Sequence, residues 1–119
     1  MKAKEMEMGM AQVTNEEAGS RRIHGGTVDM KIDENDIKII IKHYGETAQK
    51  EKAAEELEEL RFEVLNGGSY ENIAEEMADV LIMIFQLIKI YQVSEKDLQG
   101  IIDYKLIRTM MRIRDGEQK

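Results

Sequence analysis

Two pairs of carboxylates with the same spacing are the residues of this sequence best suited to chemistry. Glu56 and Glu59 form the first pair, and Glu76 and Asp79 form the second. In a helix, a spacing of three residues places two side chains about 5–6 Å apart on one face. Four carboxylates that meet in one partly buried cleft repel one another, and divalent cations remove that repulsion. An all-oxygen ligand set favours Mg²⁺ or Mn²⁺ over Zn²⁺.

The second pair stands at the entrance of the most apolar stretch of the chain. Every residue from Val80 to Phe85 is apolar, which is typical of a helix that is buried on most of its faces. A carboxylate at such an entrance is costly unless a cation compensates its charge. For Asp79, that cation is either a bound metal ion or a basic side chain, Lys105 or Arg108, in a buried salt bridge. The first pair, taken alone, also fits an ordinary solvated helix face.

Four helices are expected to position these pairs. Apolar periodicity and capping residues indicate helices over 34–44, 47–66, 70–91 and 95–114, and they predict an all-α fold. The short turn between the second and third helices makes these two helices antiparallel. Because Glu59 and Glu76 lie about equally far before and after that turn, the two carboxylate pairs are expected to face each other.

The third helix carries more apolar surface than the other helices of a chain of this length can cover. Its second half is apolar on most faces, so we expect a four-helix core of antiparallel helices that is completed by oligomerisation. In the fourth helix, five apolar residues are predicted to face inward: Leu98, Ile101, Ile102, Leu106 and Met110.

Length and composition limit the class of protein. The 119 residues correspond to one domain. We place a helical domain at 31–119 and a mobile or loosely packed extension at 1–30, where no period is sustained. The net charge of −7 argues against nucleic-acid binding. The apolar runs are too short to span a membrane, the start lacks a signal-like core, and the absence of cysteine fits a reducing compartment. We therefore expect a soluble, cytoplasmic protein that does not bind membranes.

The ordered pair of carboxylate motifs resembles a known family signature. Glu56-x-x-Glu59, then sixteen residues, then Glu76-x-x-Asp79 followed by an apolar run, is similar to the signature of the MazG-like superfamily of all-α nucleoside triphosphate pyrophosphohydrolases. The resemblance covers roughly residues 34–114. It implies a homodimer or homotetramer in which the four acids bind Mg²⁺. It also implies cleavage of the α–β phosphoanhydride of a (deoxy)nucleoside triphosphate, which yields a monophosphate and pyrophosphate.

Roles for individual residues follow from this resemblance. Glu59 and Glu76 are both candidates for the catalytic base that takes a proton from the attacking water, and the sequence does not choose between them. Lys105 and Arg108 are expected to hold phosphate oxygens. Lys52, one turn before the first acid pair, is a further candidate for phosphate binding. All three basic residues also fit an ordinary solvated surface.

Two other hypotheses remain beside the enzyme. One is a non-catalytic helical interaction or regulatory protein whose acids form a charged face. The other is a metal-binding relative of the family that has lost its activity. Stabilisation by a metal ion would distinguish the enzyme from the non-catalytic interaction protein. Turnover would distinguish the enzyme from the inactive metal-binding relative. The base and the sugar of a nucleotide substrate stay open.

Overall fold

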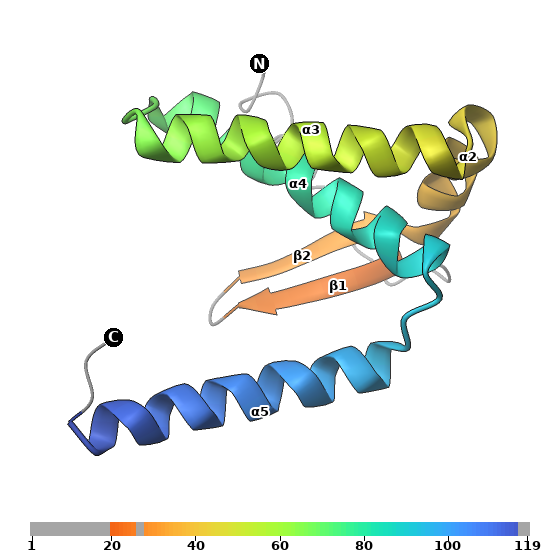
Figure 1. Ribbon diagram of the computed structural model, residues 1–119. Helices are drawn as coiled ribbons and strands as arrows, with labels where there is room; N and C mark the ends of the chain where they lie inside the picture. Colours follow the sequence, from red (N-terminus) through yellow and green to blue (C-terminus); the bar gives the residue numbers. More distant parts are fainter. Residues whose placement is uncertain (1–19, 26–27, 117–119) are drawn as a thin grey trace.

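A long antiparallel helix pair forms the centre of the molecule (Figure 1). The computed structural model describes residues 20–25 and 28–116. Helix α3 (Glu46–Leu65) packs against helix α4 (Tyr70–Ile90), which returns in the opposite direction. In the turn between them, Gly67 has a φ of 66°, a left-handed conformation that glycine adopts without strain. The Ser69 side chain then caps α4 by accepting a hydrogen bond from the backbone N–H of Asn72 at 3.1 Å.

Helix α2 (Glu34–Tyr44) packs against both members of this pair. Asp33 caps its start by accepting a hydrogen bond from the backbone N–H of Asn35 at 2.8 Å, and Gly45, with a φ of 95°, ends it. The most buried apolar side chains come from all three helices and define the core: Ile37 of α2, Ala53 of α3, and Val80 and Met83 of α4.

The helix boundaries agree closely with the sequence-based expectation. Helices α2 and α5 (Glu95–Arg114) span the predicted residues, α3 begins and ends one residue earlier than predicted, and α4 ends one residue earlier. The four predicted helices are thus confirmed. Of the described helices, none is both long and apolar enough to cross a lipid bilayer.

A two-stranded hairpin precedes the helices and was not predicted. Strand β1 (Ser20–Gly25) pairs antiparallel with β2 (Val28–Asp33), and Ser20 lies opposite Asp33. The hairpin crosses residue 30, where we expected the extension to end. Apolar and polar residues alternate through Val28-Asp29-Met30-Lys31-Ile32-Asp33, which is the period of a strand, so a signal was present. The remainder of the expected extension, residues 1–19 and 26–27, lies outside the described residues.

Helix α5 does not join the helical core of its own chain. None of its residues is buried, and Figure 1 shows it as a separate arm that extends away from α3 and α4. Leu106 and Met110, which were predicted to face inward, are 60% and 59% exposed. Within one chain the packed core therefore has three helices, and the inward orientation predicted for the fourth is wrong for the single chain.

Candidate metal centre

Three of the four predicted carboxylates meet between α3 and α4. Oxygen atoms of Glu56, Glu76 and Asp79 lie within 4.8 Å of one another. Glu56 comes from α3, and the other two come from successive turns of α4. The tight turn at Asn66–Ser69 produces this meeting, because it folds α4 back along α3 and places positions equally distant from the turn side by side.

The cluster is partly buried and leaves carboxylate oxygens unsatisfied. Glu56 is only 6% exposed. Among the described residues, its Oε1 atom and the Oε1 atom of Glu76 are buried without a hydrogen-bond partner. Buried polar groups of a folded protein are normally paired, and an unpaired buried carboxylate oxygen is particularly costly. A cation at this point would satisfy both atoms.

Burial and mutual repulsion raise the pKa values of the two acids on α4. Burial is the largest cause that raises the pKa of Glu76 to about 7, followed by the negative charges of Glu59, Asp79 and Glu56. The pKa of Asp79 is also raised above its usual range, first by burial and then by the charge of Glu56. The cluster is therefore electrostatically unfavourable at neutral pH without a compensating cation.

One basic side chain adjoins the three acids. The Nζ atom of Lys52 lies 3.1 Å from Oε2 of Glu56, and this hydrogen bond is the main reason why the pKa of Lys52 is raised. Half of the Lys52 side chain is exposed, so water screens its charge. Of the three predicted phosphate-binding residues, Lys52 is the one that the structure places beside the cluster.

Glu59, the fourth predicted ligand, lies at the rim of the cluster. Its side chain is exposed, and its oxygens are not among those that meet within 4.8 Å. It is nevertheless close enough for its charge to raise the pKa of Glu76. Glu76 thus belongs to the three-acid cluster, and Glu59 adjoins the cluster through a side-chain hydrogen bond to Glu76, which also raises the pKa of Glu76.

Lys105 and Arg108, the other two predicted phosphate-binding residues, lie away from the cluster. Both are exposed on α5, which extends away from α3 and α4 (Figure 1). The Arg108 guanidinium lies over the ring of Tyr104, 5.4 Å from its centroid. The proposed salt bridge from Asp79 to either residue is therefore not formed within one chain.

Two buried glutamines further along the same helix pair were not predicted from the sequence. Gln49 of α3 is 6% exposed, and Gln86 of α4 is 2% exposed. The Nε2 atom of Gln86 lies 3.5 Å from the sulfur of Met83, and its Oε1 atom has no partner among the described residues. The signal was a single polar residue between the apolar residues Phe85 and Leu87 of α4. Gln49 and Gln86 are equally far from the turn at Asn66–Ser69, about two helical turns beyond Glu56 and Asp79.

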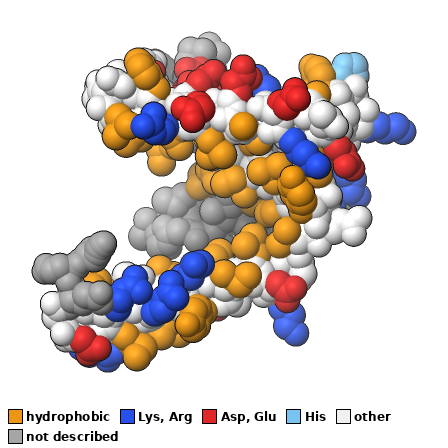
Figure 2. All heavy atoms as spheres, viewed as in Figure 1, with side chains coloured by type: hydrophobic (Ala, Val, Ile, Leu, Met, Phe, Trp, Pro, Cys, Tyr) orange, Lys and Arg blue, Asp and Glu red, His pale blue; other side chains and the backbone are white. Residues whose placement is uncertain are grey.

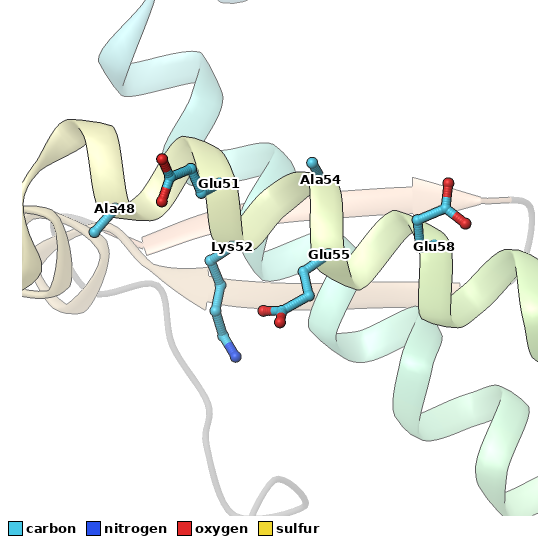
Figure 3. Close-up of a pocket in the computed structure, with 6 residues that line it drawn as sticks. All are labelled: Ala48, Glu51, Lys52, Ala54, Glu55 and Glu58. Atoms are coloured by element: carbon cyan, nitrogen blue, oxygen red, sulfur yellow. The ribbon is translucent and has the colours of Figure 1, made fainter.

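A wide hollow on α3 shares Lys52 with this centre but none of the three clustered acids. It has a volume of about 480 Å³ and is lined by residues of α3 alone: Ala48, Glu51, Lys52, Ala54, Glu55 and Glu58. Figure 3 shows Lys52 and Glu55 extending to one side of the helix, and Glu51 and Glu58 to the other. Three carboxylates around one lysine repel phosphate groups, so this hollow does not suit a nucleotide.

Comparisons of the chain with protein-family models, with curated proteins and with solved structures find no match. The carboxylate cluster is therefore the feature from which a function is inferred.

Proposed function

We propose that this protein is a Mg²⁺-dependent nucleotide pyrophosphohydrolase. It would cleave the α–β phosphoanhydride of a (deoxy)nucleoside triphosphate and release a monophosphate and pyrophosphate. The observation that carries this proposal is the meeting of Glu56, Glu76 and Asp79, whose oxygens lie within 4.8 Å across two antiparallel helices. These acids belong to the two motifs on which the resemblance to the MazG-like superfamily depends.

The donor set fits a hard divalent cation. All three acids offer carboxylate oxygens, and two of those oxygens are buried without a hydrogen-bond partner in the described part of the chain. Glu56, Glu76 and Asp79 would hold Mg²⁺, or Mn²⁺ in its place. A metal ion bound by these residues supplies charge stabilisation for phosphate oxygens and lowers the pKa of a nearby water.

Position favours Glu59 over Glu76 as the catalytic base. Glu76 is committed to the cluster, whereas Glu59 lies one turn along α3 from Glu56 with an exposed carboxylate. In the proposed reaction, a water oxygen bonds to a phosphorus atom of the α–β bridge and the bridging P–O bond breaks. The proton of the water passes to the Glu59 carboxylate, and the monophosphate and pyrophosphate separate.

Lys52 is the residue best placed to bind phosphate oxygens within one chain. Its side chain is half exposed and already reaches an oxygen of Glu56, so it sits between the cluster and the solvent from which a nucleotide arrives. Lys105 and Arg108 take part in phosphate binding only in an arrangement that brings α5 against α3 and α4.

We further propose that the protein acts in the cytoplasm as a homodimer or homotetramer. Its substrates are nucleotides rather than nucleic acids, because a net charge of −7 repels extended polyanions. The absence of cysteine supports a reducing compartment.

A product assay tests the reaction. The purified protein is incubated with each common ribo- and deoxyribonucleoside triphosphate, with Mg²⁺ and with a chelator, and the products are separated by chromatography. We expect Mg²⁺-dependent formation of monophosphate and pyrophosphate, lost in Asp79→Asn and kept in Glu58→Gln, which changes an exposed acid of α3. Diphosphate plus inorganic phosphate would show that a different bond is cut. No product from any of these nucleotides with Mg²⁺ or Mn²⁺ would contradict the proposal.

A non-catalytic interaction protein with an acidic face is the second candidate. It is favoured by one observation, the long apolar surface of α5 that its own chain leaves exposed. A protein that shows neither turnover nor stabilisation by Mg²⁺ would support this candidate over the enzyme.

A further inference from the structure

We propose that Lys52 is a built-in counter-ion of the carboxylate cluster: its ammonium group competes with a divalent cation for Glu56 and turns out to solvent when that cation binds. Without a metal ion, Lys52 offsets part of the negative charge of the cluster. With a metal ion, the same side chain is released toward the phosphate oxygens of a nucleotide. The inference rests on the proposed function, because it takes Glu56, Glu76 and Asp79 as the metal ligands.

The two carboxylate oxygens of Glu56 have different surroundings. Its Oε2 atom lies 3.1 Å from the Nζ atom of Lys52, whereas its Oε1 atom is buried without a hydrogen-bond partner in the described part of the chain. The side chain of Glu56 is 8% exposed and that of Lys52 is 52% exposed. Lys52 therefore reaches from the solvent to a buried carboxylate, and its ammonium group occupies one of the two oxygens that Glu56 can offer to a metal ion.

Helix stability alone does not account for this ion pair. Acid and base four residues apart stabilise a helix better when the acid comes first, and here Lys52 precedes Glu56. The carboxylate is also buried, so it has lost hydration that an exposed surface pair keeps. The contact is better explained by the charge of the cluster than by the helix that carries both residues.

The charge of Lys52 acts on more of the site than Glu56. Burial and the neighbouring acids raise the pKa of Asp79, and the Lys52 ammonium group opposes them. The pKa of Lys52 is itself raised, mainly by its hydrogen bond to Glu56 and to a smaller extent by the charges of Glu55 and Glu59. Lys52 thus serves as a counter-ion for the cluster as a whole.

The other basic residues of the described chain are engaged elsewhere or lie far from the cluster. Helix α3 carries seven carboxylates against three basic residues. Figure 2 shows acidic side chains gathered along this helix, whereas the densest group of basic side chains lies on α5. Lys50, the nearest basic neighbour of Lys52 in α3, lies over the ring of Tyr91 at 4.9 Å from its centroid. The task of compensating the cluster therefore falls to Lys52.

An ammonium group and a divalent cation compete for the same carboxylates. Like charges a few ångströms apart repel each other, and the repulsion grows where water is excluded. A divalent cation has twice the charge of lysine and bonds directly to carboxylate oxygens. Lys52 is the partner that moves, because its side chain is half exposed and its flexible four-carbon stem lets the ammonium group leave Glu56 without movement of the helix.

The first test measures metal binding in the absence of nucleotide. Mg²⁺ is titrated into the full chain by calorimetry at a fixed ionic strength. Lys52→Met keeps the length of the side chain and removes its charge, so we expect the Mg²⁺ dissociation constant to fall about fivefold or more. We also expect a lower urea midpoint in chelator, because the metal-free cluster has lost its counter-ion.

Two further variants show whether the effect belongs to the charge at this position. Lys96→Met is the matched control, because it removes the same charge from an exposed position in the first turn of α5. It should leave both the metal affinity and the urea midpoint unchanged. Lys52→Arg keeps a cation beside Glu56 and should bind Mg²⁺ within about twofold of the wild type.

The second test follows the Lys52 side chain in the wild type and needs no substitution. The chain is treated with an amine-acylating reagent, once with chelator and once with saturating Mg²⁺, and mass spectrometry measures the labelled fraction of each lysine. An ammonium group held by a carboxylate is protected from acylation. We expect the labelling of Lys52, relative to that of Lys96, to rise about threefold or more when Mg²⁺ is added.

Four results would overturn the proposal. Metal binding that is no tighter in Lys52→Met than in the wild type would do so and leave the metal centre in place. Unchanged or reduced labelling of Lys52 at saturating Mg²⁺ would show that it stays on Glu56. Equal tightening in Lys96→Met would reduce the effect to net charge. A wild type that binds neither Mg²⁺ nor Mn²⁺ would refute the metal centre of the proposed function, and this inference with it.

Discussion

Replacement of Glu76 by glutamine should stabilise the metal-free protein. The glutamine side chain has the same shape but no charge, so it removes the repulsion between Glu76 and the neighbouring acids and leaves that between Glu56 and Asp79. The folded-state pKa of Glu76 is raised to about 7, chiefly by burial. In the unfolded chain the group titrates at its ordinary value of 4.5. Between these values, the folded protein holds a proton that the unfolded chain has released, so stability falls as the pH rises through this window.

The size of the effect follows from the pKa difference. One pKa unit corresponds to about 1.4 kcal/mol, so the change from 4.5 to about 7 sets an upper limit of about 3 kcal/mol. Part of the Glu76 side chain is in contact with water, which screens its interaction with the neighbouring charges. We therefore expect Glu76→Gln to raise the free energy of unfolding by about 1–2 kcal/mol above pH 7 and to leave it nearly unchanged below pH 4.5.

Urea unfolding with a chelator present, followed by circular dichroism at several pH values, measures this difference. Glu58→Gln is the control, because Glu58 is exposed on the opposite side of α3 and its replacement should change stability by less than about 0.5 kcal/mol. The reasoning is refuted if Glu76→Gln is less stable than the wild type at about pH 8, or if the gain persists unchanged at about pH 4.

Two further predictions concern the metal and the turn. At one hundred times its dissociation constant, Mg²⁺ should stabilise the folded wild type by about 2.7 kcal/mol, which is measured as a rise in melting temperature. We expect this rise to be absent in Asp79→Asn and present in Glu58→Gln. An equal rise in Asp79→Asn would mean that Asp79 is not a ligand. Ser69→Ala should lower the free energy of unfolding by about 1 kcal/mol, because it removes the side-chain oxygen that accepts the Asn72 N–H. A urea midpoint equal to that of the wild type would show that this cap contributes nothing.

Local sequence signals were enough to predict the helices of the fold. Capping residues such as Ser69 and Ser94, together with the glycine at Gly45, mark helix ends in the sequence itself, and they predicted the four helices within one residue. The hairpin was not predicted because its strands are only six residues long and lie in a region without helical periodicity. Short strands give little pattern to detect.

The arrangement of α5 could not be read from the sequence. Its apolar spacing predicts a covered helix, and it does not say which chain provides the cover. The direction of the helix depends on Gln92, a residue type that only occasionally adopts the left-handed conformation found here. The spacing of three in the sequence also treats Glu56 and Glu59 alike. Only the packing of α3 on α4 shows that Glu56 joins the three-acid cluster, whereas Glu59 lies beside it in contact with Glu76.

The carboxylate cluster lies where the helix pair would otherwise be apolar. Glu56 follows the buried Ala53 by one turn of α3, and Asp79 directly precedes the buried Val80 of α4. Apolar residues at the acid positions would pack as well and avoid the buried, unpaired oxygens. A sequence that follows the rules of helix packing along the rest of α3 and α4, and departs from them at three acids that meet in space, points to a site kept for binding rather than for stability.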